Sequence, residues 1–249
     1  MAILWQKTIR GQHYEIRSAG RTRRLYTNGV CHSEFNPFHI FSGSIWDLLI
    51  LPAWFYSASD IRRILVLGVG GGSNVLQLEH LLEPELILGI ERDPVHLRLA
   101  RKFFDIENSC SEIIEVDARG WLANYNGEPF DMIIDDLFMD CGNEPVRAVK
   151  VNREWSQLLI RNLKKGGLLT INFASGEELT ASAIVRQSRF HHRFPSMFRM
   201  TTPLLDNNVG VFIGRQVNSR YLRERLRRHP VAERAIANRR IRYRINQLV

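Results

Sequence analysis

The stretch RILVLGVGGGSN, from Arg63 to Asn74, decides the fold class. Its apolar run Ile64–Leu67 has the composition of a strand buried on both faces of a parallel sheet. Glycines follow at once, at Gly68, Gly70 and Gly72, and helical spacing begins at Asn74. Glycine lets the backbone turn sharply beneath a ligand, and the next helix directs free N–H groups toward that ligand. The pattern is typical of a nucleotide-binding turn, and the alternative is a glycine-rich chain reversal that binds nothing.

Acidic residues end the next three predicted strands. Leu86–Ile90 runs into Glu91, Glu112–Val116 into Asp117, and Phe130–Ile134 into the pair Asp135 and Asp136. The carboxyl ends of parallel strands share one edge of a sheet, so we expect these acids to converge on one crevice. We predict that Glu91 binds ribose hydroxyls, and that Asp117, with its neighbour Ala118, binds adenine. Each acid could instead cap the following helix, and Asp117 is well placed to do so.

Composition excludes several classes of protein. The chain has 249 residues, of which 45% are hydrophobic and 24% charged, as in ordinary soluble domains. No apolar run reaches the length of a membrane span, and the N-terminus lacks the pattern of a secretory signal. Three scattered cysteines, at positions 31, 110 and 141, show no metal-ligand spacing. We therefore expect a cytoplasmic protein with no membrane association and no metal site.

The basic charge is concentrated in one segment. Residues 215–249 hold eleven arginines and two glutamates, and this segment accounts for the net charge of +8. One interpretation is a solvated helix whose apolar residues Tyr221, Leu222 and Leu226 dock on the domain. The other is contact with nucleic acid, which a charge run alone supports only weakly. We favour the docked helix.

The chain divides into three parts. Residues 1–59 are predicted as an N-terminal β-hairpin and helix, with strands at Tyr14–Arg17 and Arg24–Thr27. Residues 60–215 alternate strands and helices and form the Rossmann-like adenosyl-binding domain. Residues 137–150 show no clear pattern and are predicted as a loop over the site. Residues 216–249 form the arginine-rich, helical C-terminal tail.

Several of these motifs resemble those of the spermidine synthase family, within the class I S-adenosylmethionine methyltransferase superfamily. The resemblance rests on Ile64–Asn74, Gly89–Asp93, Val116–Arg119, Phe130–Asp136 and, more weakly, Thr27–Val30 and Asn207–Val211. It implies an α/β fold with a seven-stranded sheet and an adenosyl cofactor, either S-adenosylmethionine or decarboxylated S-adenosylmethionine. It also implies that Asp136 is the catalytic aspartate that helps to deprotonate the attacking amine.

Other positions depart from the pattern of that family. The acid of the family's glycine loop is replaced by Gly71, and the acid that methyltransferases place before the loop is replaced by Val66. The second aspartate after the catalytic one is replaced by Met139, with Asp140 one place late. His32 and the stretch Asn36–Ile40 replace further family residues. A non-standard polyamine pocket is therefore expected.

Three classes of function follow from these features. The first is a transferase that moves an aminopropyl or methyl group to a small-molecule acceptor such as an amine, with Asp136 polarising the nucleophile. The second is a non-catalytic adenosyl binder, and the third is a nucleic-acid methyltransferase. The third is disfavoured because the fourth strand lacks the Pro-Pro-aromatic signature of base-amino methylation. A homodimer is considered as the assembly.

Overall fold

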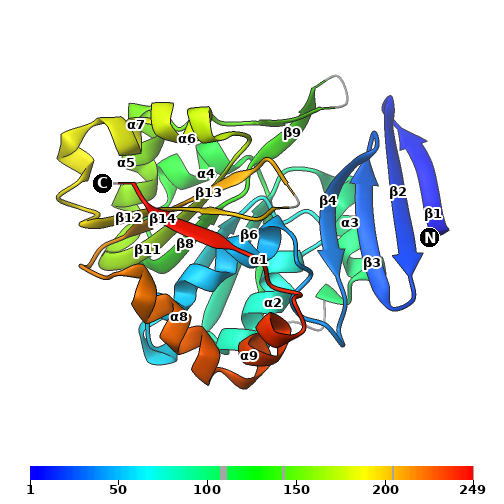
Figure 1. The fold of residues 1–249 in the computed structure, drawn as a ribbon. Coiled ribbons are helices and arrows are strands. Elements are labelled where there is room, and N and C mark those ends of the chain that lie inside the picture. Colours follow the sequence, from blue (N-terminus) through cyan, green and yellow to red (C-terminus); the bar gives the residue numbers. More distant parts are fainter. Residues whose placement is uncertain (107–110, 142–143, 204, 249) are drawn as a thin grey trace.

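The protein is built around one eight-stranded sheet. The structure, a computed structural model, describes residues 1–106, 111–141, 144–203 and 205–248 (Figure 1). The strand order is β14-β12-β13-β11-β8-β5-β6-β7, with β7, β6, β5, β8 and β11 parallel and the other three antiparallel. The strands are β5 (Arg63–Leu67), β6 (Leu86–Glu91), β7 (Glu112–Glu115), β8 (Phe130–Asp135), β11 (Leu163–Phe173), β12 (Ser196–Thr201), β13 (Asn208–Ile213) and β14 (Arg244–Gln247).

The α/β fold class is confirmed, but the predicted count of seven strands is wrong. The eighth strand is β14, which pairs antiparallel with the edge strand β12. It comes from the tail that was predicted as helical, and only Ile245 of its four residues is buried. A strand of four residues with a single inward side chain has too little alternation to be recognised in sequence.

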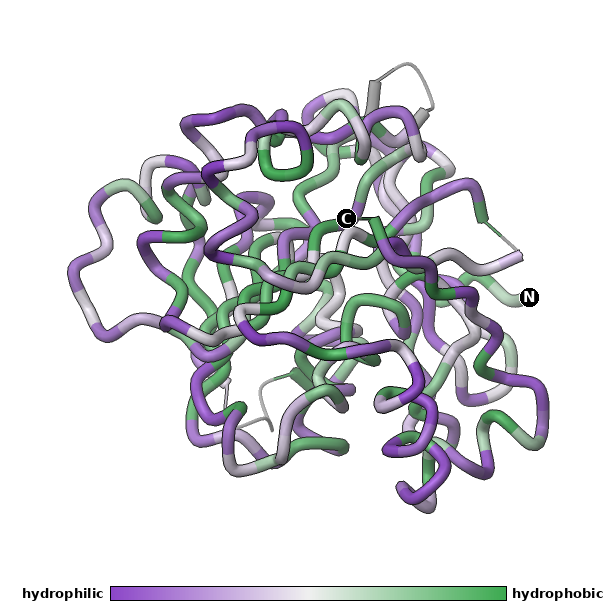
Figure 2. The backbone as a smooth tube through the Cα atoms, turned by 60° about the vertical axis from the view of Figure 1, so that its left-hand side comes forward, coloured by the Kyte–Doolittle hydropathy of each residue, from purple (hydrophilic) through white to green (hydrophobic). Residues whose placement is uncertain are grey.

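Helices cover both faces of the sheet. Alternate residues of β5 point to opposite faces, so Ile64 and Val66 enter one core while Leu65 and Leu67 enter the other. The first core is covered by α1 (Ile45–Ile50), η1 (Leu51–Phe55), α2 (Ser73–Leu82), α8 (Ser219–Arg228) and α9 (Pro230–Ala237). The second is covered by α4 (Ala118–Asn124), α5 (Arg153–Arg161), α6 (Gly176–Ala181), α7 (Ala183–Arg186) and η4 (Ser188–Phe190). Figure 2 shows that the strands at the centre of the molecule are predominantly hydrophobic, whereas hydrophilic residues gather on the outer turns and helices.

The N-terminal region is a separate four-stranded antiparallel sheet rather than a hairpin. Its strands are β1 (Ala2–Ile9), β2 (Gln12–Ala19), β3 (Thr22–Thr27) and β4 (Val30–Phe35), in that order. The predicted strands lie within β2 and β3, while β1 is exposed along most of its length and carries no alternation to detect. Tyr14, Ile16 and Leu25 of this sheet pack against α3 (Pro94–Phe103), which joins it to the main sheet. In Figure 1 the small sheet lies beside the end of the main sheet that carries β6.

The tail docks largely as predicted. Leu222 and Leu226 of α8 are fully buried in the first core, whereas Tyr221, also predicted to dock, is 40% exposed. Arg225 donates to the carbonyl of Tyr56, and the Arg215 guanidinium lies over the Tyr56 ring, 3.7 Å from its centroid. The tail is therefore an integral layer of the fold.

Residues 137–150, predicted as a loop, contain a short hairpin. Strands β9 (Phe138–Cys141) and β10 (Glu144–Arg147) pair antiparallel directly after β8. Arg147 holds the base of this hairpin by donating to the Asn172 and Val149 carbonyls. The hairpin has no amphipathic pattern because it projects from the sheet (Figure 1). Cys110 and the side chains of Asp140 and Cys141 lie outside the described part of the chain.

Candidate active site

A cavity of about 840 Å³ opens where the strand ends meet the N-terminal sheet. It lies at the point where strand order reverses between β5 and β8, which is where open α/β sheets bind ligands. Six of the seven predicted site residues line it: Gly68, Gly70, Glu91, Asp117, Ala118 and Asp136. Gly72 does not line it; this residue precedes α2 with φ of +91°, and a Cβ there would collide with Ile106.

The glycine loop is held in a conformation that other residues rarely adopt. Gly68 and Gly70 have φ values of +86° and +55°. A Cβ at Gly68 would strike the carbonyl oxygen of Asp136, and one at Gly70 would lie 2.8 Å from the carbonyl oxygen of His32. The loop therefore packs its backbone against the segment that follows β8 on one side and against β4 on the other.

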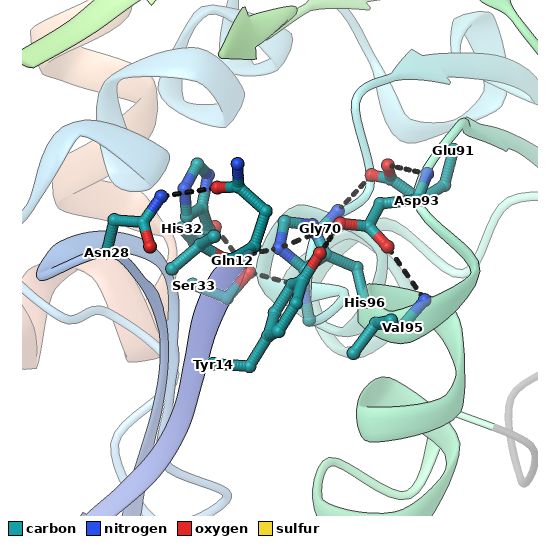
Figure 3. A network of polar contacts seen from close by, with 12 residues as sticks. Gln12, Tyr14, Asn28, His32, Ser33, Gly70, Glu91, Asp93, Val95 and His96 are labelled. Atoms are coloured by element: carbon teal, nitrogen blue, oxygen red, sulfur yellow. Dashed lines mark hydrogen bonds and ion pairs between the residues drawn. The ribbon is translucent and has the colours of Figure 1, made fainter. Parts of the chain in front are cut away.

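Glu91 is buried and braces this loop. Its Oε2 accepts from the backbone N–H groups of Val69 and Gly70 at 3.1 and 2.8 Å, and its Oε1 accepts from Asp93 N at 2.8 Å (Figure 3). The same carboxylate lines the cavity. Glu91 thus holds the glycine loop in place, and it also lies where the sequence predicts contact with the ribose.

Asp117 performs the capping role that was left open in the sequence. Its Oδ1 accepts from the N–H groups of Arg119 and Gly120, both at 3.1 Å, and so begins α4. The carboxylate is nevertheless exposed and lines the cavity, and the buried Ala118 beside it provides an apolar wall. Capping leaves this carboxylate in contact with the cavity.

Asp136 lies at the carboxyl end of β8 and lines the cavity. Its backbone N–H donates to Leu67 O at 2.9 Å, and its Oδ1 accepts from Asn172 Nδ2 at 2.8 Å. Burial raises the pKa of Asp136 to about 6, against the opposing effects of Asn172, Arg147 and Trp46, while Asp135 adds to the rise. A carboxylate held near neutral pKa in a cleft is suited to proton transfer.

Asp135 points to the other face of the sheet, as predicted for consecutive strand residues. It is fully buried and accepts from both Arg147 Nη2, at 2.8 and 2.9 Å, and Trp155 Nε1, at 2.8 Å. This ion pair fixes the β9–β10 hairpin to the end of β8. Asp135 is thus structural, and Asp136 alone of the pair faces the cavity.

Known proteins share both sequence and fold with this chain. A polyamine aminopropyltransferase 2 from Caldanaerobacter subterraneus subsp. tengcongensis is 29% identical over 138 residues, which cover 54% of this chain and 44% of that protein. A polyamine aminopropyltransferase from Chromobacterium violaceum is 26% identical over 129 residues, covering 51% and 48%. The chain thus spans about half the length of the relatives it matches. No protein-family model matches it.

Solved structures show the same architecture. A probable spermidine synthase from Corynebacterium glutamicum superposes with a TM-score of 0.74 at 16% identity, covering 99% of this chain and 91% of that one. The predicted resemblance to the spermidine synthase family is confirmed. Human methyltransferase-like protein 13, in complex with SAH, has a TM-score of 0.60 at 17% identity, covering 78% and 90%, so the wider class I methyltransferase fold is also present.

The structure explains one departure from the spermidine synthase pattern. A Cβ at Gly71 would lie 2.8 Å from the Ser33 Cβ and 3.0 Å from the Phe104 ring. Ser33 Oγ also accepts from Gly71 N at 2.6 Å. The position of the family's loop acid is therefore closed by β4 and by the residue after α3, and a carboxylate does not fit there without rearrangement.

A polar network on the N-terminal side of the cavity was not predicted. Tyr14 of β2 donates to Asp93 Oδ2 at 2.9 Å (Figure 3). Thr27 Oγ1 lies 2.8 Å from His96 Nε2. The His96 ring lies 4.9 Å from the His32 ring, centroid to centroid. These side chains come from strands and a helix far apart in sequence, so no local pattern could have joined them.

Asn172 and Trp46 were also missed. Asn172 is the second-to-last residue of β11, which lies beside β8, so the strand-end rule that identified the acids could have found it. Trp46, in α1, lines the cavity near Asp136 but carries no signal that separates it from core residues. Among the described residues, no cluster of three or more His, Cys, Asp or Glu side chains could hold a metal ion, and no helix is long and apolar enough to cross a membrane.

Proposed function

We propose that this chain is a transferase that uses decarboxylated S-adenosylmethionine and delivers its aminopropyl group to a small amine. One observation carries the proposal: the glycine loop and the strand-end acids Glu91, Asp117 and Asp136 meet in a single cavity. Its volume of about 840 Å³ lies within the range of small-molecule sites, and it offers room for a nucleoside and an acceptor together.

The adenosyl end of the proposed site is the part lined by Gly68, Gly70, Glu91, Asp117 and Ala118. The glycines present bare backbone, so a ligand can approach where a Cβ would stand. Glu91 holds that backbone in place through Oε2, and its Oε1, which accepts from Asp93 N, has a second lone pair for a ribose hydroxyl. Asp117 is proposed to accept from the adenine amino group while Ala118 packs against the ring.

The reacting end is proposed to centre on Asp136. When bound, the sulfonium supplies an electrophilic carbon for the amine to attack. With a pKa of about 6, Asp136 is ionised at neutral pH, so it can hold the acceptor ammonium and accept the proton that the nitrogen must lose. Asn172, donating to Oδ1, fixes the direction of the carboxylate.

The acceptor end is proposed to differ from a standard polyamine pocket. Arg24 and Glu34 both line the cavity, and Arg24 Nε donates to Glu34 Oε2 at 2.6 Å, so this acid is already neutralised. Asp93 keeps its charge, but one of its oxygens already accepts from the Tyr14 hydroxyl. Because a long polyamine needs several free carboxylates, we propose an acceptor with few cationic nitrogens.

A homodimer stays a prediction.

Methyl transfer to an unidentified acceptor is the second candidate. The observation that favours it is the closed position at Gly71, which removes the family's acid for the aminopropyl amine. The class I methyltransferase architecture is compatible with this activity, but fold alone does not choose between the two reactions. A non-catalytic adenosyl binder is disfavoured because Asp136 keeps both its position and a near-neutral pKa.

Turnover of the Asp136→Asn variant tests this proposal. The protein is incubated with decarboxylated S-adenosylmethionine or S-adenosylmethionine and a panel of amines, and products are identified by mass spectrometry. We expect the wild type to aminopropylate at least one small amine, and the variant to turn over ~100-fold more slowly with unchanged adenosyl affinity.

Arg119→Ala is the matched control, because Arg119 neighbours the site but is exposed and pairs with Glu154. We expect its turnover to be that of the wild type. Methylated products only would establish the second candidate instead. Adenosyl binding with no product from any amine would contradict the aminopropyltransferase assignment.

A further inference from the structure

The arginine-rich tail forms a second pocket that the proposed activity does not use. This tail pocket has a volume of about 420 Å³ and is lined by Arg223, Arg227, Ile236, Tyr243, Arg244, Ile245 and Asn246. It shares no lining residue with the large cavity. A cleft of this size is within the range that small ligands occupy.

The packing of the tail brings the three guanidiniums together. Leu222 and Leu226 turn one face of α8 into the core, and Arg223 and Arg227, one turn apart, extend from it toward β14. On β14, the buried Ile245 anchors the strand, and the exposed Arg244 reaches the same pocket. Figure 1 shows β14 running along the sheet edge beside the tail helices.

The arginines of the tail pocket are not neutralised by acids of the tail. Of the two tail glutamates, Glu224 pairs with Arg220 at 2.8 Å, and Glu233 lies in the first turn of α9. Neither lines the pocket, nor does any other acid among the described residues. By contrast, Arg215 and Arg225 are engaged by carbonyl groups of η1 and its C-cap. Some arginines of the tail thus attach it to the rest of the fold, whereas those of the tail pocket do not.

Tyr243 adds a hydroxyl and an aromatic ring to the pocket. Arg223 and Arg227 line the same pocket as this hydroxyl; burial raises the pKa of Tyr243, and the two guanidiniums act to lower it. Asn246 contributes a side-chain amide. Guanidinium, hydroxyl and amide donors around one concave surface match the oxygens of a phosphate group.

We propose that the tail pocket binds a small phosphorylated ligand, such as a nucleotide or an oligophosphate, through Arg223, Arg227 and Arg244. Like charges one helical turn apart repel each other, and an anion between them relieves that repulsion. The tail pocket is concave, which favours a small ligand. A nucleic-acid backbone would instead need basic residues along an extended surface. This site is independent of the proposed transferase activity.

Binding of inorganic tripolyphosphate by calorimetry tests the proposal, because this probe lacks the nucleoside that the large cavity is proposed to take. We expect one site per chain in the full-length wild type. The double variant Arg223→Ala/Arg227→Ala should weaken binding at least ~10-fold, and Arg244→Ala should weaken it as well. Arg234→Ala removes the same charge from an exposed position of α9 outside the pocket, and it should change affinity less than ~2-fold.

Parallel titrations with GTP and with a short single-stranded RNA distinguish the sources of phosphate. GTP should bind like tripolyphosphate and lose affinity in the same variants. Absence of tripolyphosphate binding at millimolar concentration would overturn the proposal, as would equal losses in Arg234→Ala. RNA binding that is tighter than tripolyphosphate binding and is lost in the double variant would also overturn it, because the same arginines would then bind nucleic acid. An unchanged melting temperature without ligand confirms that each variant is folded.

Discussion

Ionisation of the Asp136 carboxyl lowers the stability of the folded protein. Its folded pKa of about 6 lies above the ordinary value of 3.8, so ionised Asp136 opposes folding. Below about pH 4 the carboxyl is protonated in both states and the penalty is absent. The penalty grows as the pH rises through 6 and is complete above it. Active sites commonly retain such groups at the expense of stability.

Asp136→Asn should therefore stabilise the unliganded protein at high pH. The amide oxygen can still accept from Asn172, but no charge needs to be buried. We expect a gain on the order of 1–3 kcal/mol in the free energy of unfolding at pH 8 and none near pH 4. Urea unfolding of wild type and variant at both pH values measures this. A variant that is less stable at pH 8 would show that the Asp136 carboxylate supports the fold.

Individual residues show where sequence reasoning succeeds and where it stops. Gly68, Glu91 and Asp136 were predicted because strand ends in a parallel sheet must share one edge. The bonds from Glu91 to the loop N–H groups, and the closure of Gly71 by Ser33, were not predicted. Both depend on distances between segments that the sequence does not encode locally.

At the scale of elements, strong local signals were reliable and weak ones were not. Strand β5, the glycine loop and α2 form a continuous apolar–glycine–helix pattern, and they lie as predicted. Strands β1 and β14 were missed because their residues are mostly exposed and do not alternate. The β9–β10 hairpin was taken as a loop because its stability comes from Arg147 and Asp135 rather than from a hydrophobic face.

Strand β14 is expected to anchor the tail through Ile245. This residue is 7% exposed and belongs to the first core, so its truncation leaves a cavity between β12 and the tail helices. Ile245→Ala should lower the free energy of unfolding by about 2–4 kcal/mol, whereas the exposed neighbour Arg242→Ala should change it by less than ~0.5 kcal/mol. Chemical denaturation provides both values. Equal stabilities would mean that β14 is not part of the cooperative fold.

At the scale of the whole molecule, the site exists only where three layers meet. The main sheet supplies the glycine loop and the acids, α1 supplies Trp46, and the N-terminal sheet supplies Tyr14, Thr27 and His32. Neither sheet encloses the cavity alone. The sequence predicted the cavity wall formed by the main sheet, because that wall is built from successive βαβ units. It could not predict the wall formed by the N-terminal sheet, which depends on how the two sheets pack across α3.

The central claim is that the large cavity holds an adenosyl ligand, and calorimetric titration with methylthioadenosine tests it most directly. We expect the wild type to bind one equivalent and to show no binding of NAD. Ala118→Phe places an aromatic ring in the proposed adenine end of the cavity. Accommodating both rings should cost about 1–3 kcal/mol, so we expect methylthioadenosine affinity to fall at least ~10-fold. Binding of NAD without methylthioadenosine, or methylthioadenosine affinity that Ala118→Phe leaves unchanged, would contradict the account.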